Sequence, residues 1–241
     1  MNNKTTLVIL VRDELDAIKH LLPKIPLNSV DEIIVMDGQS KDGTKEFMEK
    51  QELKVFTQKK LGRGNAFIEA LEKTENENLI FFSGDGNENP EDIPKMNQYL
   101  KEGHDLVIGG RFILGGSKSD DSDDFFKIRK YGNIAFSKIV DIIWNSNVKD
   151  SINGFRGMKR SAMEKMKLDA PKHEIELQST IRASKLKLKI EEFPTVEQIR
   201  LGGIRKNTAG THILAYRLSL FLIKEILIGK KFTKKPLGVE I

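Results

Sequence analysis

The segment NLIFFSGDGNENPEDI, residues 78–93, places a polar turn directly after a short apolar run. Residues 79–82 are apolar and partly aromatic, which is typical of a strand that is buried on both faces. Gly84 and Gly86 then allow a tight turn and leave room for a ligand to approach the backbone closely. A buried strand that ends in a polar turn is typical of an α/β protein, in which ligands bind at the strand ends.

The same turn carries oxygen atoms that suit a divalent cation. Asp85 supplies a carboxylate, and Asn87 and Asn89 supply amide oxygens at alternate positions. A Mg2+ or Mn2+ ion that bridges a diphosphate needs only one or two protein oxygens, because phosphate and water complete its shell. We therefore expect a metal site with Asp85 as the main ligand and the two asparagines as helpers. The alternative is an Asx-rich turn that caps the helix beginning near Pro90.

Strand-like and helix-like segments alternate along the chain on both sides of this turn. Further strands are expected at residues 7–11, 32–36, 53–57, 105–109 and 188–193. Helices are expected at residues 15–22, 44–50, 65–73, 92–100, 129–145, 172–186 and 211–228. This alternation predicts an α/β fold with a mainly parallel sheet flanked by helices. Residues 151–158 are expected to form an irregular turn region, and residues 115–124 a mobile loop.

Polar residues follow three of the expected strands, at the edge where such sheets bind ligands. Asp37 follows the second strand, Asp85 the fourth and Arg111 the fifth. Asp37 could accept a hydrogen bond from a nucleobase or a ribose, although the next residues also fit a simple turn and helix cap. The stretch 62–64, Gly-Arg-Gly, could hold an anion at a helix start. With only two glycines, a turn is the simpler interpretation.

The composition limits the class of protein. The chain has 241 residues, no cysteine, four histidines and a net charge of +5. Disulfides, thiol catalysis and thiolate metal sites are excluded. The apolar run at residues 7–11 is too short for a signal peptide, and nothing approaches the ~20 apolar residues of a membrane span, so we expect a cytoplasmic location. The charge suits phosphorylated molecules or anionic lipid, and nucleic-acid binding is not expected because basic and aromatic residues do not interleave.

The order of these pieces is more specific than any one of them. The stretches that carry a resemblance are ILVRDE (9–14), DGQSKDGT (37–44), GRGNA (62–66), DGNENPEDI (85–93), DLVIGGRF (105–112), DSINGFR (150–156), EIEL (174–177) and the basic residues from Arg200 to Lys206. In this order, the sequence resembles the family 2 glycosyltransferases with the GT-A (Rossmann-like) fold, and among them the polyprenyl-phosphate (dolichol-phosphate) sugar synthases. It departs from their pattern at Gly38 and Asn87, which replace carboxylates, and at Arg205, which replaces a serine.

The resemblance implies a domain plan and a set of roles. Residues 1–210 would form the GT-A catalytic domain, and residues 211–241 a C-terminal amphipathic helix and basic tail. The nucleotide-sugar would contact Asp13, Glu14, Asp37, Gly64, Asp85, Gly86 and Asn87. The acceptor or its phosphate would contact Arg111, Arg129, Asn153, Arg200 and Lys206. Catalytic roles fall to Asp85, Glu176, Arg111 and Arg129.

The implied reaction moves a hexose, with inversion, from a GDP- or UDP-sugar to polyprenyl or dolichyl phosphate with the help of Mg2+ or Mn2+. The donor base, the sugar and the oligomeric state stay open. A hydroxyl acceptor on a soluble molecule or glycan is the first alternative, and Glu176 could then act as the base. A non-catalytic nucleotide-sugar- or lipid-binding module is another. A sugar nucleotidyltransferase is disfavoured because residues 12–15 lack the glycines which that class expects after its first strand.

The expected C-terminal helix, residues 211–228, is apolar around most of its circumference, with Arg217, Lys224 and Glu225 on a narrow polar stripe. An interfacial helix on the cytoplasmic face of a membrane fits this pattern, with the lysines at 230–231 and 234–235 facing anionic headgroups. Packing on its own domain or in a dimer is the alternative. In the acidic stretch 117–124, repulsion should keep the loop open until a cation or ligand enters, unless it is an ordinary solvated loop.

Overall fold

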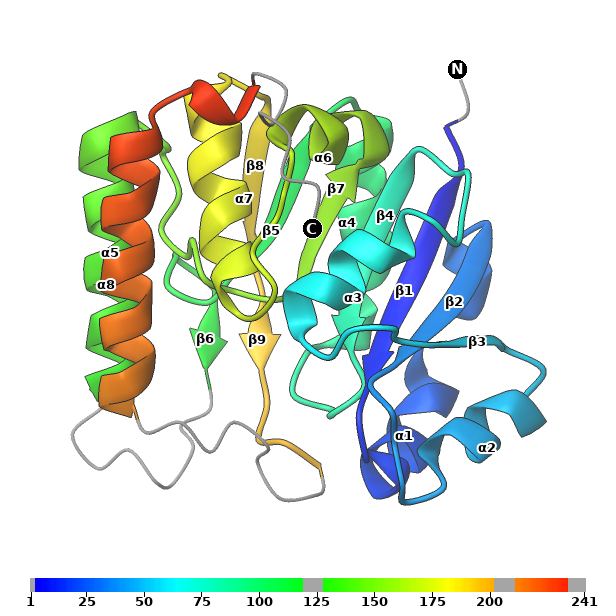
Figure 1. The fold of residues 1–241 in the computed structure, drawn as a ribbon. Helices are drawn as coiled ribbons and strands as arrows, with labels where there is room; N and C mark the ends of the chain where they lie inside the picture. The colour runs from blue at the N-terminus through cyan, green and yellow to red at the C-terminus, as the bar shows by residue number, and fades with distance from the viewer. Residues whose placement is uncertain (1–2, 119–127, 202–210, 234–241) are drawn as a thin grey trace.

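The computed structural model describes residues 3–118, 128–201 and 211–233. A seven-stranded sheet with the order β3-β2-β1-β4-β7-β5-β8 forms its centre (Figure 1). The strands are β1 (Thr5–Val11), β2 (Glu32–Asp37), β3 (Lys54–Thr57), β4 (Asn78–Ser83), β5 (Leu106–Gly110), β7 (Arg156–Lys159) and β8 (Ile190–Pro194). Only β7 runs antiparallel to its neighbours in this sheet. The mainly parallel sheet confirms the predicted fold class.

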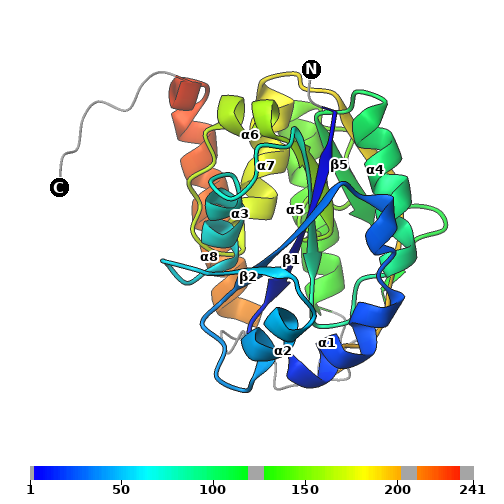
Figure 2. The same ribbon diagram turned by 90° about the vertical axis from the view of Figure 1, so that its right-hand side faces the viewer.

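Helices cover both faces of the sheet (Figure 2). One face packs on α3 (Arg63–Ala70), α6 (Arg160–Met166) and α7 (Glu174–Lys185), and the other on α1 (Leu15–Leu21), α2 (Thr44–Lys50) and α4 (Ile93–Lys101). Within β1, Val8 packs with the first set, whereas Leu7 and Ile9 pack with the second. Side chains alternate between the faces of a strand, so a central strand covered on both sides is apolar at every position.

A further helical layer lies beyond α7 and consists of α5 (Ile128–Trp144) and α8 (Thr211–Ile228) (Figure 1). Val140 of α5, Leu177 and Ile181 of α7, and Leu218 and Leu222 of α8 form one buried apolar cluster. The predicted C-terminal helix is therefore present and packs on the rest of the chain. None of the helices in the described ranges is long and apolar enough to cross a membrane.

The polar stripe expected on α8 is arranged differently from the prediction. Glu225 is fully buried and accepts hydrogen bonds from Arg182 Nη2 at 2.9 Å and Lys185 Nζ at 2.8 Å, both from α7. Arg217 pairs with Glu174, also of α7. Two of the three stripe residues therefore fix α8 to α7, and of these residues only Lys224 is exposed.

The expectation of an irregular turn over residues 151–158 is wrong at its end, because β7 begins at Arg156 and lies between β4 and β5. The sequence Arg-Gly-Met-Lys has no apolar periodicity. Its burial comes from its neighbours: a Cβ at Gly157 would lie 2.8 Å from Leu100 of α4, so the glycine allows α4 to pack closely. In the expected mobile loop, Ser117–Lys118 form β6, which pairs with β9 (Val196–Glu197), and residues 119–124 lie outside the described ranges.

Candidate active site

The turn after β4 carries Asp85 and is closed by its own residues. Glu88 Oε2 accepts a hydrogen bond from the backbone nitrogen of Ser83 at 2.6 Å. Asp85 Oδ1 accepts one from the nitrogen of Asn87 at 3.3 Å. Gly86 sits between them at φ +80°, in the left-handed region that glycine adopts readily. The chain therefore reverses within a few residues and holds Asp85 at the carboxyl end of β4.

The oxygen atoms of this turn fit a hard divalent cation. Burial raises the pKa of the Asp85 carboxyl above its ordinary value, and the nearby Glu197 raises it further. Asn87 Oδ1 is buried and has no hydrogen-bond partner within the described residues. Nor do those residues hold a cluster of three or more His, Cys, Asp or Glu side chains that could bind a metal alone. Diphosphate and water oxygens would therefore have to complete the shell of an ion here.

Asn89 caps the helix that follows the turn, as the alternative interpretation of this segment predicted. Its Oδ1 accepts a hydrogen bond from the nitrogen of Glu91 at 3.2 Å and caps the short 3-10 helix Pro90–Asp92. The asparagine oxygen is thus engaged in a cap, and Asp85 and Asn87 are the oxygen donors that the turn leaves available.

A buried guanidinium lies behind the turn. Arg63, at the start of α3, pairs through Nε with Glu176 Oε1 at 2.6 Å and through Nη2 with Glu88 Oε1 at 3.6 Å. Its Nη1 donates a hydrogen bond to Ser83 Oγ at 2.8 Å. Although burial alone would lower it, the two carboxylates raise the pKa of Arg63. Burial raises the pKa of Glu88 to about 8.

The Gly-Arg-Gly stretch packs closely against the loop before α7. A Cβ on Gly64 would lie 1.9 Å from the carbonyl oxygen of Ala170, and the nitrogen of Asn65 donates to the oxygen of Pro171 at 3.1 Å. Since Arg63 turns inward and Asn65 N is already paired, the stretch serves packing and ion pairing, which agrees with the simpler interpretation as a turn.

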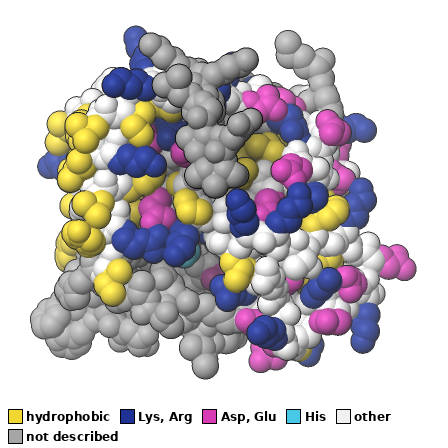
Figure 3. Space-filling view, in the orientation of Figure 1, with side chains coloured by type: hydrophobic (Ala, Val, Ile, Leu, Met, Phe, Trp, Pro, Cys, Tyr) yellow, Lys and Arg dark blue, Asp and Glu magenta, His cyan; other side chains and the backbone are white. Residues whose placement is uncertain are grey.

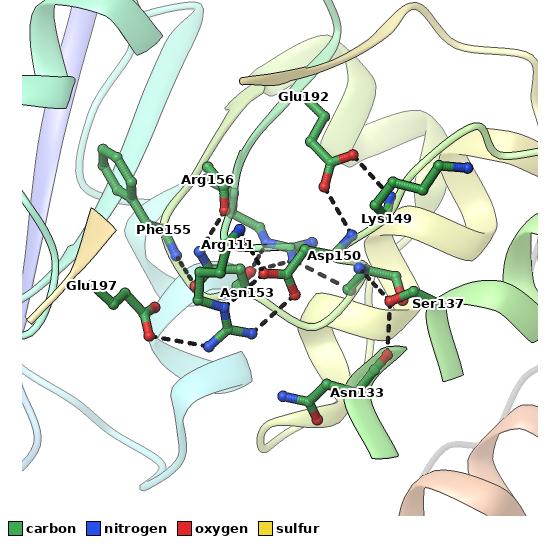
Figure 4. Close-up of polar contacts among 12 residues, drawn as sticks. Arg111, Asn133, Ser137, Lys149, Asp150, Asn153, Phe155, Arg156, Glu192 and Glu197 are labelled. Atoms are coloured by element: carbon green, nitrogen blue, oxygen red, sulfur yellow. Dashed lines mark hydrogen bonds and ion pairs between the residues drawn. The ribbon is translucent and has the colours of Figure 1, made fainter. Parts of the chain in front are cut away.

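A second buried guanidinium belongs to Arg111, directly after β5 (Figure 4). Its Nε and Nη2 donate to the two oxygens of Asp150 at 2.6 and 2.9 Å, and its Nη1 donates to Glu197 Oε2 at 3.1 Å. These two carboxylates raise the pKa of Arg111, against the effect of burial. Both edges of the Arg111 guanidinium are therefore occupied by protein carboxylates, and a phosphate would have to compete with them.

Asn153 and Arg156 hold the loop that follows Asp150 (Figure 4). The amide of Asn153 donates to the carbonyl of Gly109 and accepts from the nitrogen of Phe155. Arg156 Nη1 donates to the carbonyl of Glu176 at 2.7 Å and thereby ties the loop to α7. Asn153 is buried in this network. Its predicted acceptor contact would therefore require the loop to change.

The residues expected near the donor base lie at the ends of β1 and β2. Asp37 is buried, and its carboxylate accepts hydrogen bonds from the nitrogens of Gln39 and Ser40 at 3.0 and 3.2 Å. Asp13 has φ +49° and accepts a hydrogen bond from the nitrogen of Lys41 at 2.6 Å. These contacts join the two strand ends into one edge.

The segment after β9 crosses the Asp85 turn. The nitrogen of Gln198 donates to the oxygen of Asn87 at 2.7 Å, and that of Leu201 donates to the oxygen of Asp85 at 3.0 Å. The side chain of Leu201 covers Gly86, where a Cβ would lie 2.7 Å from it. Between them, Arg200 pairs with Glu14 at the end of β1. The fold therefore brings Glu14, Asp85 and Arg200 together from three distant parts of the chain.

Charges around Asp85 do not balance within the described residues. Arg63 forms ion pairs with Glu88 and Glu176, and Arg111 forms ion pairs with Asp150 and Glu197. Each of these two groups of one arginine and two carboxylates therefore has one surplus negative charge when its members are ionised. Asp85 adds a third negative charge. Arg156, whose charge is coupled to Glu176 and Asp150, offsets one of the three, and the surplus equals the charge of one divalent cation. Four members of this site were not predicted from the sequence, although the first three lie in the motif stretches quoted above: Arg63, Glu88, Asp150 and Glu197. Of the other predicted residues, Arg129 is the second residue of α5 but its side chain is not described, and Lys206 lies outside the described ranges.

Comparison with known proteins adds an identification to this geometry. The model of the family described as glycosyl transferase family 2 matches residues 7–167, most of the chain. The chain belongs to glycosyl transferase family 2. The matched region begins within β1 and includes β2 to β5, β7 and the turn with Asp85, and the sheet with its flanking helices is the GT-A fold.

The curated relatives of this family member include three archaeal proteins. It is 29% identical over 178 residues to the glycosyltransferase AglJ of Haloferax volcanii (73% of this chain, 56% of that protein). It is 29% identical over 185 residues to the dolichol-phosphate mannosyltransferase of Pyrococcus furiosus (73% of this chain, 50% of that protein). It is 26% identical over 212 residues to the UDP-N-acetylglucosamine–dolichyl-phosphate N-acetylglucosaminyltransferase of Methanococcus voltae (78% of this chain, 83% of that protein). The chain thus spans about half the length of the first two relatives.

Solved structures support the fold. Glucosyl-3-phosphoglycerate synthase from Mycobacterium tuberculosis, crystallised with Mn2+, UDP and glucosyl-3-phosphoglycerate, superposes with a TM-score of 0.71 at 18% identity, over 92% of this chain and 79% of that one. The same enzyme with Mg2+ and UDP gives a TM-score of 0.72, over 92% and 78% of the two chains. At this identity the likeness shows the GT-A fold alone.

Proposed function

We propose that this chain transfers a hexose from a nucleoside diphosphate sugar to a polyprenyl phosphate, with inversion at the anomeric carbon, and that it uses Mg2+ or Mn2+. The observation that carries the proposal is the turn after β4. It presents Asp85 and the Oδ1 atom of Asn87, which has no hydrogen-bond partner among the described residues, beside two groups of buried carboxylates that each have surplus negative charge when ionised. The names of the dolichyl-phosphate transferases from Pyrococcus furiosus and Methanococcus voltae support the acceptor class.

The proposed role of each residue follows from its position in the site. Asp85 and Asn87 would hold the cation, which would neutralise the charge that the diphosphate gains as the C1–O bond breaks. Asp37, Asp13 and Glu14, at the ends of β2 and β1, would bind the nucleoside. A phosphate acceptor is already ionised at neutral pH, so it needs orientation more than deprotonation. Its proposed ligands include Arg200, Arg129 and Lys206, while Arg111 would contribute mainly by orienting Asp150 and Glu197.

A hydroxyl acceptor is the second candidate, and one observation favours it. Glu176 Oε2 is buried and has no hydrogen-bond partner in the described part of the chain, while Oε1 of the same carboxylate pairs with Arg63. A carboxylate with one free oxygen could accept the proton of an attacking hydroxyl, or hold a hydroxyl of the donor sugar. With a phosphate acceptor, only the second role applies.

The acceptor proposal also agrees with the surface of α5 and α8. Both helices expose large apolar side chains away from α7 (Figure 3), and we propose that this surface, with residues 211–241, associates with the cytoplasmic face of a membrane. The exposed apolar residues are Tyr131, Ile139, Ile142, Ile143, Ile213, Tyr216, Leu220, Ile223, Ile226 and Leu227. Lys224, Lys230 and Lys231 are exposed at the same surface or directly after α8, where they could meet anionic headgroups.

Radiolabelled GDP- and UDP-sugars, offered with polyprenyl phosphate and with or without Mn2+ or Mg2+, test the function. We expect label in the lipid phase with one donor, dependence on the cation, and loss of turnover in Asp85→Ala. Parallel reactions with soluble hydroxyl acceptors distinguish the second candidate. A binding module would bind nucleotide-sugar without any turnover. Full activity of Asp85→Ala would overturn the proposed site.

A further inference from the structure

Glu88 is a buried carboxylate in the Asp85 turn whose charge the turn itself does not need. Its Oε2 accepts a hydrogen bond from the backbone nitrogen of Ser83 at 2.6 Å, and this hydrogen bond closes the turn. A neutral oxygen such as that of glutamine could accept the same hydrogen bond. Burying a full charge is unfavourable unless the charge is compensated, so a carboxylate that is 4% exposed at this position keeps its negative charge only when a cation lies nearby.

Arg63 supplies only part of that compensation. Its guanidinium lies 2.6 Å from Glu176 but 3.6 Å from Glu88, so its charge is directed mainly to Glu176. The side chains of Glu88 and Asp85 leave the same tight turn, and their charges are coupled to each other. Between them, Asn87 contributes an amide oxygen without charge. The second carboxylate of the turn therefore lies one residue after the neutral Asn87.

We propose that Glu88 is a positioning residue that strengthens divalent-cation binding at Asp85 through its negative charge, in place of the charge that Asn87 lacks. This inference rests on the proposed function, because it requires the cation to bind at Asp85 together with a nucleoside diphosphate. Glu88 need not contact the ion. It acts as an outer partner that closes the turn through Ser83 and attracts the cation through space.

Titration of Mn2+ into the full chain, with saturating UDP or GDP, tests the role by calorimetry and without turnover. We expect Glu88→Gln to weaken Mn2+ binding by about 10- to 100-fold, as is usual when outer partners of a metal ligand are lost. Glu91→Gln is the matched control, because Glu91 is an exposed carboxylate on the same segment and should change the affinity little. Melting curves of both variants show whether they are folded.

A second variant separates the charge from the structure of the turn. Glutamine at position 88 can still accept the hydrogen bond from Ser83, so Glu88→Gln removes the charge and keeps the turn closed. Asn87→Asp returns one negative charge to the turn, so the double variant should recover most of the lost affinity. No recovery, or equal affinity of Glu88→Gln and Glu91→Gln, would overturn the role of Glu88 while leaving the proposed function intact. If the unmodified chain binds no Mn2+ with either nucleotide, the metal-dependent function fails, and this inference fails with it.

Discussion

At the scale of single residues, glycines decide how closely the parts of the site approach one another. A Cβ on Gly154 would lie 2.1 Å from Nη2 of Arg63, so the guanidinium reaches its carboxylates only because this position has no side chain. Gly64 brings α3 equally close to the loop before α7. Both glycines are therefore required by packing, whereas their neighbours in the motif carry the charges.

Gly64→Ala tests this packing argument. The new Cβ would meet the backbone oxygen of Ala170, which cannot rotate away, so we expect the free energy of unfolding to fall by about 1–3 kcal/mol. Gly132→Ala is the control: Gly132 lies inside α5 with nothing within 4 Å of its Cβ position, and alanine should add about 0.5–1 kcal/mol. Urea denaturation measures both. A lower free energy of unfolding in both variants, or in neither, would contradict the packing role of Gly64.

Glu192 gives a pH dependence of stability that can be measured separately. Its two carboxylate oxygens accept hydrogen bonds from the backbone nitrogens of Lys149 and Asp150, both at 2.8 Å (Figure 4). Burial raises the pKa of Glu192 to about 7. Between the ordinary pKa, about 4.5, and this value, the folded state binds more protons than the unfolded state. The contribution of Glu192 to the free energy of unfolding therefore falls as pH rises from about 4.5 to 7.

Glu192→Gln removes this titration. As pH rises from 5 to 8, the free energy of unfolding of the variant should increase relative to that of the unmodified chain, by at most about 3 kcal/mol. The reason is that the variant has no buried carboxyl group to ionise at this position. Its absolute stability at pH 5 can be lower, since glutamine has only one oxygen to accept from two nitrogens. Urea denaturation at several pH values measures the difference, with Glu91→Gln as an exposed control. Parallel pH profiles of all three chains would refute the prediction.

At the scale of elements, α8 is divided between an inner and an outer side. Leu218, Leu222 and Glu225 face α5 and α7, whereas Leu227 is 74% exposed. The exposed side of α8 continues onto α5, where Ile142 is also 74% exposed. An apolar surface that spans two helices is much larger than the scattered apolar residues of an ordinary protein surface, and this size is the basis for the proposed contact with a membrane.

Liposome flotation tests this surface. We expect the chain to float with vesicles that contain anionic lipid and the variant Ile142→Asp/Leu227→Asp to remain at the bottom, because charges at an apolar contact with lipid must be desolvated. Leu27→Asp, at a leucine that is 36% exposed and lies outside both helices, should float like the unmodified chain. Equal flotation of all three proteins would remove the surface from the proposed mechanism.

The elements also show where the sequence was informative. Short apolar runs predicted β1, β2, β4 and β5 to within about two residues. By contrast, β7 was missed because a strand of Arg, Gly, Met and Lys has no periodic signal, and its burial depends on α4 and on its neighbouring strands.

At the scale of the whole molecule, the sheet gathers charges from distant segments at one edge. Arg63 comes from α3, Asp85 from the β4 turn, Asp150 from the loop before β7, Glu176 from α7 and Glu197 from β9. Each segment contributes one side chain, and their surplus of negative charge exists only when the segments are assembled. This is why a cation site formed from two protein oxygens is physically reasonable here although no dense cluster of ligands is present among the described residues.

The sequence by itself determined the alternation of strands and helices, the position of Asp85 at the end of a buried strand, and the resemblance to family 2 glycosyltransferases, because each of these follows from local order along the chain. Only the tertiary structure decided the partners of the charged residues. Arg111, expected as a phosphate ligand, pairs with Asp150 and Glu197, and Glu225, expected in a solvent-facing stripe, is buried against α7. Ion pairs in a protein interior join segments far apart in sequence, and the sequence spacing of such residues does not reveal which of them meet.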